Sequence, residues 1–215
     1  YEKKVADVIS KSYELIKKVK PDALVVLGDT YSGLSVLPAK DQGVKIFHME
    51  AGLRAWDKRM PEQTNRKLID HISDILLPFN QYHRENLIRE DIHPSKIFIS
   101  GNPTFEVLDA FQDKIESSLI MDKLKLSSKD YILVTAHRKE NVDDPLAFQS
   151  ILKGLGLIYK KFKKEIIYPM HPRTQSKLNE VSVPEGIRVM DPLGYYDFNK
   201  LTKNAFCLVS DSGTS

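Results

Sequence analysis

The chain has 215 residues, of which 41% are hydrophobic and 28% charged, and its formal net charge at pH 7 is +3. This length suffices for one large or two small globular domains, each with a buried core. The charge is small, and basic and acidic residues are interspersed along the chain. The composition therefore predicts neither a general nucleic-acid-binding protein nor a membrane-surface protein.

We also expect neither a membrane span nor a signal peptide, because the sequence has no long apolar run and no basic segment followed by an apolar one. Cys207 is the single cysteine and lies in the apolar run 205–209. That setting favours a small buried hydrophobic side chain over a reactive thiol. Since no disulfide can form within the chain, a reducing, cytoplasmic compartment is expected.

Strands and helices alternate along the first half of the chain. Apolar side chains at three- and four-residue steps from Val5 to Val19 predict a helix that ends at Pro21. The wholly apolar run 23–27 predicts a strand buried on both faces of a parallel sheet. The same rhythm then predicts strand 44–48, helix 62–73, strand 75–78, helix 81–90, strand 96–100 and a helix around 104–111.

The segment 112–130 is rich in Lys, Ser and Asp and lacks clear periodicity, so we place a domain boundary there. The predicted domains are 1–115 and 116–215. Beyond the boundary the pattern predicts strand 131–135, helix 145–161, strand 165–168, helix 174–180, strand 187–190, helix 197–204 and strand 206–210. Such alternation indicates an α/β fold with mostly parallel sheets. Because the chain opens on a helix and closes on a loop, we expect a first strand and a C-terminal part to be missing from it.

Polar residues follow the predicted strands, and ligands of open parallel sheets bind beyond the carboxyl ends of the strands. These residues are Asp29, Glu50, the pair His137 and Arg138, the segment 171–173 and the segment 210–215. Each has a structural alternative. Asp29 suits the N-cap of a helix, Glu50 suits a structural pair with Arg54, and Glu62 after Pro61 suits the first turn of a helix.

In the second half, Arg138 suits bidentate contacts to a phosphate, and the hydroxyls of 210–215 would precede a helix N-terminus that can bind an anion. The segment is not a Walker A loop, and the chain has no G-x-G-x-x-G motif. A metal site of His48, Glu50 and His71 is conceivable, but their spacing matches no known zinc arrangement. We therefore expect no metal.

Seven ordered blocks resemble the signatures of one family, the non-hydrolysing UDP-N-acetylglucosamine 2-epimerases. They are GDT at 28–30, HMEAGLR at 48–54, MPEQTNR at 60–66, Asp70 with Ser73 and Asp74, GNPT at 101–104, TAHRKEN at 135–141 and SDSG at 210–213. Two positions depart from the commonest pattern: Gln63 stands where a second acid is usual, and Thr214 where a second glycine is frequent. Together with DHISD at 70–74 and PLGYYDFNKL at 192–201, these departures make the chain resemble the capsule and O-antigen branch, which includes UDP-N-acetyl-L-fucosamine synthases.

The resemblance implies a GT-B architecture, in which two Rossmann-like domains enclose an active-site cleft. It implies that Asp29, Glu50, Glu62 and His137 are catalytic, and that Arg138, Ser212 and Gly213 bind the UDP part of a UDP-N-acetylhexosamine. It further implies a homodimer that needs no cofactor. The rival functions are a GT-B glycosyltransferase, a hydrolysing epimerase and a catalytically inactive sugar-nucleotide sensor.

The resemblance also implies a mechanism. The hydrogen on carbon 2 is not acidic, because no carbonyl lies beside it. The family eliminates UDP to leave a 2-acetamidoglucal, then protonates the opposite face of carbon 2 and adds UDP back. This chemistry needs a base, an acid on the other face and support for the departing diphosphate, which carboxylates and a histidine can supply.

Overall fold

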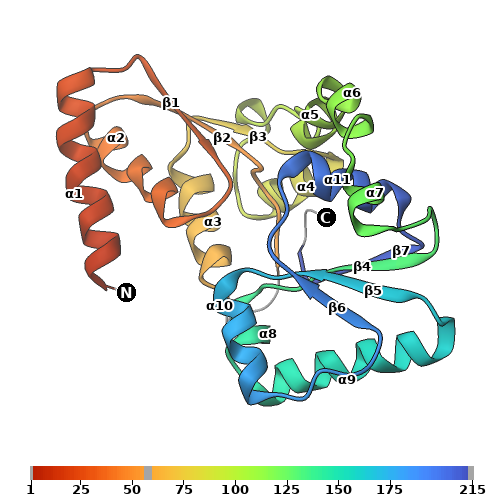
Figure 1. The fold of residues 1–215 in the computed structure, drawn as a ribbon. Coiled ribbons are helices and arrows are strands. Elements are labelled where there is room, and N and C mark those ends of the chain that lie inside the picture. The colour runs from red at the N-terminus through yellow and green to blue at the C-terminus, as the bar shows by residue number, and fades with distance from the viewer. Residues whose placement is uncertain (1, 56–59, 213–215) are drawn as a thin grey trace. The chain divides into compact units, whose positions relative to one another are not determined.

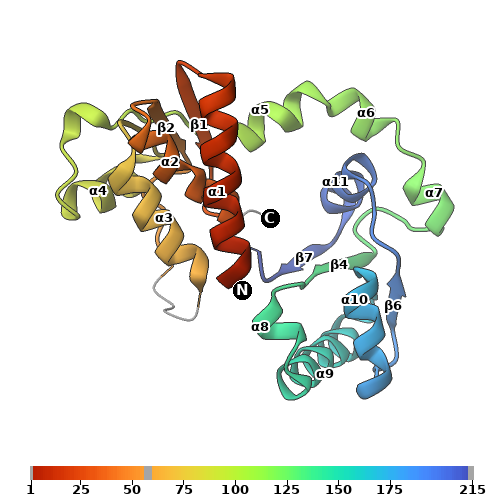
Figure 2. The same cartoon turned by 90° about the vertical axis from the view of Figure 1, so that its left-hand side faces the viewer.

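The computed structural model of the chain describes residues 2–55 and 60–212. It divides into two compact units, Tyr1–Val107 and Leu108–Ser215. The division falls within helix α5 (Pro103–Ala110), whereas composition placed a boundary at 115/116. The two units are described in turn (Figures 1 and 2).

Unit 1 is built on a parallel sheet of three strands in the order β1-β2-β3. The strands are β1 (Ala23–Leu27), β2 (Lys45–Met49) and β3 (Ile75–Leu77). The remaining elements are α1 (Glu2–Val19), η1 (Tyr31–Ser35), α2 (Val36–Asp41), α3 (Pro61–Ile72), α4 (Gln81–Arg89) and η2 (Pro94–Lys96). Ile16 of α1, Val36 of α2 and Ile69 of α3 pack with Val26 and Ile46 of the sheet, so these three helices cover one face.

Unit 2 is a four-stranded parallel sheet in the order β6-β5-β4-β7. The strands are β4 (Tyr131–Thr135), β5 (Glu165–Pro169), β6 (Ile187–Met190) and β7 (Cys207–Ser210). The helices are α6 (Gln112–Glu116), α7 (Ile120–Leu124), α8 (Lys139–Val142), α9 (Pro145–Phe162), α10 (Pro172–Gln175), η3 (Ser176–Glu180) and α11 (Tyr195–Asn204).

Helices cover both faces of the sheet of unit 2. Successive residues of a strand point to opposite faces, so they pack in two different cores. Ile132 and Val134 pack against Phe148 and Leu152 of α9, whereas Leu133 packs in the core that contains Leu201 of α11. Figure 2 shows α9 and α10 on one side of β4 and α11 on the other. The predicted α/β fold with parallel sheets is confirmed.

Two predictions of burial were wrong. Val25 and Leu27 on β1 are 62% and 60% exposed, because α1, α2 and α3 cover the opposite face of this sheet. Cys207 on β7 is exposed rather than buried; among the described residues β7 pairs with β4 alone. An apolar run therefore predicted these strands without predicting which of their faces the described residues cover.

Two predicted elements also differ in kind. The expected strand 96–100 is reduced to a bridge between Ile97 and Leu76, with Phe98 N donating to Leu76 O at 2.9 Å. The helix expected over 174–180 is the short helix α10 followed by the 3₁₀ turn η3. Within the described residues, no helix is long and apolar enough to cross a bilayer.

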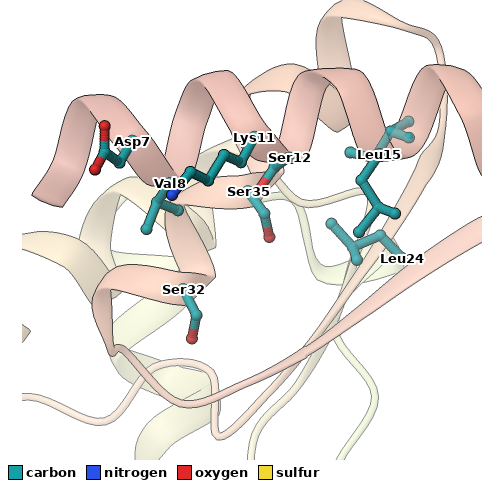
Figure 3. Close-up of a pocket in the computed structure, with 9 residues that line it drawn as sticks. Asp7, Val8, Lys11, Ser12, Leu15, Leu24, Ser32 and Ser35 are labelled. Carbon is teal, nitrogen blue, oxygen red and sulfur yellow. The ribbon is translucent and has the colours of Figure 1, made fainter.

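Unit 1 also carries a groove of about 460 Å³ between α1, η1 and β1. Figure 3 shows Leu15 of α1 beside Leu24 of β1 at one end, and Val8 of α1 near Ser32 and Ser35 of η1 at the other. The groove lies against the α1 side of the sheet. None of the predicted site residues lines it.

Candidate active site

Asp29 is the second residue after β1, and Gly28 between them adopts a left-handed conformation (φ 76°) that redirects the chain. The carboxylate accepts a short ion pair from Arg66, with Oδ2 2.6 Å from the guanidinium Nη2. Its backbone carbonyl accepts from the Asn65 side chain at 3.1 Å. Asp29 caps no helix: the 3₁₀ turn that follows begins after Thr30 and has no side-chain cap. The N-cap alternative therefore does not hold.

Glu50 follows β2, the neighbouring strand, and its backbone is also left-handed (φ 68°). This conformation is costly for a residue with a side chain and is concentrated at functional sites. Glu50 Oε1 lies 3.2 Å from Arg66 Nη2, the atom that also binds Asp29. A Cβ built on Gly28 would lie 2.9 Å from Glu50 Oε2, so Gly28 leaves the space that this carboxylate occupies.

Arg66 joins the two acids, and sequence reasoning assigned it no role. It lies on α3, four residues after Glu62, and its side chain is only 6% exposed. Its Nε is buried without a hydrogen-bond partner among the described residues. Glu62 is exposed in the first turn of α3, near enough to raise the pKa of Asp29 by charge repulsion. The i, i+4 spacing of Glu62 and Arg66 was the signal available in the sequence.

Burial raises the pKa of both Asp29 and Glu50, and the positive charge of Arg66 opposes the shift without reversing it. The negative charge of Glu62 further raises the pKa of Asp29, and the negative charge of Asp29 further raises the pKa of Glu50. Neighbouring carboxyls with raised pKa values are suited to exchange protons. The arrangement is that of a general acid–base site.

The alternative pair Glu50–Arg54 does not form. Arg54 is fully buried and instead binds Asp70 at 2.8 Å and Glu90 at 2.6 Å. Its hydrogen bonds lower the pKa of Glu90 to about 2. The conceivable metal trio does not assemble either. His48 uses both ring nitrogens within the protein, and His71 lies 3.7 Å from Glu90. Within the described part of the chain, no three potential ligands are grouped to hold a metal.

In unit 2 the predicted residues lie where the strand order reverses. The sheet β6-β5-β4-β7 runs outward from β4 in both directions, so the loops after β4 and β7 flank its topological switch point. This is where open α/β sheets bind ligands. His137 and Arg138 follow β4, and Ser212 follows β7. Gly213 lies outside the described residues.

Asp211 holds these two loops together; the sequence placed it in the polar segment 210–215 but assigned it no role of its own. Its carboxylate accepts from the backbone N–H groups of His137 at 3.0 Å and Arg138 at 2.9 Å, and from the Asn141 amide at 3.0 Å. Burial would raise the pKa of Asp211, but these hydrogen bonds lower it. The His137 side chain is 62% exposed, with Nδ1 3.8 Å from Asp211. The loop geometry is therefore fixed while the imidazole stays accessible.

Taken separately, each unit carries polar groups at the carboxyl ends of parallel strands, as nucleotide-binding α/β enzymes do. A family model described as UDP-N-acetylglucosamine 2-epimerase matches residues 1–215. The chain therefore belongs to the UDP-N-acetylglucosamine 2-epimerase family, and its α/β fold is that of the GT-B-type members.

Individual relatives agree with this assignment. The chain is 38% identical over 211 residues to a UDP-N-acetylglucosamine 2-epimerase of Methanococcus maripaludis, covering 93% of this chain and 57% of the relative. It is 35% identical to a UDP-2,3-diacetamido-2,3-dideoxy-D-glucuronate 2-epimerase of Pseudomonas aeruginosa, covering 93% and 56%. A Methanocaldococcus jannaschii UDP-GlcNAc 2-epimerase, solved with UDP-GlcNAc and UDP, aligns with a TM-score of 0.89 at 34% identity, covering 97% and 60%. The chain thus spans less than two thirds of each.

Proposed function

We propose that the protein is a non-hydrolysing epimerase that inverts carbon 2 of a UDP-N-acetylhexosamine by elimination and re-addition of UDP. The observation that carries the proposal is the pair of carboxyls with raised pKa values, Asp29 and Glu50, on one arginine nitrogen. Family membership and the UDP-GlcNAc named in the M. jannaschii complex support the substrate class.

The proposed reaction has two halves. A carboxylate of the Asp29, Glu50 and Glu62 set removes the proton from carbon 2, the bond between carbon 1 and the diphosphate oxygen breaks, and a double bond forms between carbons 1 and 2. A carboxylic acid of the same set then protonates the opposite face of carbon 2, and the diphosphate oxygen bonds to carbon 1 again. One carboxylate is left protonated and another deprotonated, so the acids must exchange protons with solvent between turnovers.

The unit 2 residues serve the leaving group in this proposal. His137 assists the departing UDP, and Arg138 with Ser212 and Gly213 binds its phosphates. Backbone N–H groups and a guanidinium suit the charge that develops on a diphosphate. The sugar is UDP-GlcNAc converted to its manno epimer, or the L-talosamine to L-fucosamine equivalent of the capsule and O-antigen branch. A cytoplasmic homodimer without cofactor belongs to the same proposal.

The test is product analysis with the intact protein. Incubation with UDP-GlcNAc and, separately, with the L-talosamine derivative should yield a UDP-linked 2-epimer detected by proton NMR. Free N-acetylmannosamine plus UDP would establish the hydrolysing reaction instead, and a glycoside formed only when an acceptor is added would establish a glycosyltransferase. Binding of UDP-sugars without turnover would indicate a sensor.

A further inference from the structure

His48 is a fully buried titratable residue that the proposed reaction does not use. It lies on β2, two residues before Glu50, and none of its side chain is exposed. Its Nε2 is 2.9 Å from the carbonyl oxygen of Gly28, the residue before Asp29. Its Nδ1 is 2.7 Å from Asp70 Oδ1 on α3. The ring thus connects the two strand ends that carry the acids.

The partners of His48 determine its protonation. A carbonyl oxygen can only accept, so Nε2 must donate to Gly28. Asp70 has two further donors at its other oxygen, the Arg54 guanidinium at 2.8 Å and the Gly52 backbone N–H at 3.3 Å. A buried carboxyl held by a guanidinium retains its negative charge, so Asp70 can only accept as well. Both ring nitrogens must then carry a proton, and the imidazole is cationic.

Two groups of charged residues surround this cation. In the first, Asp70 of α3 binds His48, Arg54 binds Asp70, and Glu90 at the end of α4 binds Arg54. The second is the candidate site itself, where Arg66 of α3 binds Asp29 and Glu50. His83 of α4 is subject to the charges of both arginines, which with burial lower its pKa. Both Asp29 and Glu50 experience His48 as a charge that lowers their pKa values.

We propose that His48 is a positioning residue whose buried imidazolium donates from both ring nitrogens, fixes the strand ends behind Asp29 and Glu50 and supplies a positive charge beside these acids. This inference rests on the proposed function for its catalytic meaning, but its structural half stands on the hydrogen bonds alone. Burial drives Asp29 and Glu50 toward the neutral form, and Arg66 and His48 oppose that drive from two sides. Without His48, a larger share of both acids would be protonated at neutral pH.

The first test needs no variant. In the intact wild-type protein with ¹⁵N-labelled histidine, both ring nitrogens of His48 should give protonated-nitrogen shifts at neutral pH. The exposed His93, whose Nδ1 lies 2.8 Å from Ser95 Oγ, is the reference for an accessible imidazole. A non-protonated nitrogen on His48 at neutral pH would overturn the proposal. This outcome does not depend on whether the protein is an epimerase.

The second test links the cation to the acids. His48→Gln keeps a donor for Gly28 but removes the charge, and Asp70→Asn removes the anion that holds the imidazolium. In folded preparations of either variant, the acid limb of the kcat/KM profile should move to higher pH, and ¹³C-carboxyl NMR should show the same movement for Asp29 and Glu50. The control His93→Gln should leave both unchanged. Lower rates with an unmoved acid limb would mean that His48 is merely structural.

Discussion

Asp29 is the second residue after β1 and Asp211 the first after β7, both at the carboxyl end of a parallel strand, yet their surroundings prepare them for opposite tasks. Asp29 is buried beside another acid and shares a single arginine, so its pKa is raised. Asp211 accepts from two backbone N–H groups and an amide, so its pKa is lowered. The first carboxyl is suited to exchange a proton. The second is suited to remain charged and hold two loops. The task of an acid follows from its donors rather than from its place in the sheet.

The largest effect expected from this comparison is on the rate. Glu50→Gln removes a proton carrier from unit 1 while keeping its size, so kcat should fall by about 100-fold to 10,000-fold with UDP binding retained. Steady-state kinetics and UDP titration measure the two quantities. Glu85→Gln is the matched control, since the Glu85 side chain is 46% exposed and lies 3.9 Å from Arg89 in an i, i+4 ion pair. Unchanged kcat in Glu50→Gln would show that the active site is misplaced.

The next effect is on binding. Asp211→Asn replaces one acceptor oxygen by a donor that faces the N–H groups of His137 and Arg138. The free energy of unfolding should fall by about 1–3 kcal/mol. Because the two loops would then be less ordered, UDP should bind about 10-fold to 100-fold more weakly. Thermal unfolding and calorimetric titration with UDP are the measurements. Asp144→Asn is the control, because asparagine retains the N-cap of α9 that Asp144 provides. UDP affinity equal to wild type would contradict the assigned role of Asp211.

A smaller effect is on stability, where Asp29 and Asp211 should contribute with opposite signs at pH 7. A carboxyl with a raised folded-state pKa contributes stability only below its unfolded pKa and loses it as pH rises, so Asp29 opposes folding at pH 7. Asp211 has a lowered pKa, so its contribution is present at pH 7 and is lost as pH falls. Asp29→Asn should therefore melt at or slightly above wild type at pH 7, and Asp211→Asn below it. Calorimetric melting of both variants checks this. Equal destabilisation by the two would remove the distinction between the sites.

Metal removal is expected to have no effect on the rate. If the carboxylates of unit 1 carry protons rather than hold a metal, exhaustive chelation should leave kcat unchanged. Activity is assayed after dialysis against a chelator and after adding back zinc or magnesium. Loss on chelation followed by recovery with one of these ions would favour a metal role for the acids.

The alternation of apolar runs and amphipathic helices predicted the parallel α/β fold, because both periods follow from backbone geometry. It did not predict that Val25, Leu27 and Cys207 are exposed among the described residues, because an apolar run does not show which elements cover each face of a strand.

The candidate site was predictable only in part. The rule that ligands gather at strand ends selected Asp29, Glu50 and His137, but their catalytic roles remain predictions. Arg66 and Asp211 were given no role, because their importance lies in hydrogen-bond partners 16 to 74 residues away in the chain. His48 was considered only as a metal ligand, since the sequence could not show that both its nitrogens are satisfied.

The central claim is that unit 1 carries out proton exchange at carbon 2, and isotope incorporation tests it most directly. The intact protein is incubated with its UDP-N-acetylhexosamine in deuterated water, and the product is examined by proton NMR. Because enzyme carboxyls remove one proton and deliver another after exchange with solvent, the epimer should carry deuterium at carbon 2. An epimer that retains the original hydrogen at that carbon would contradict the account.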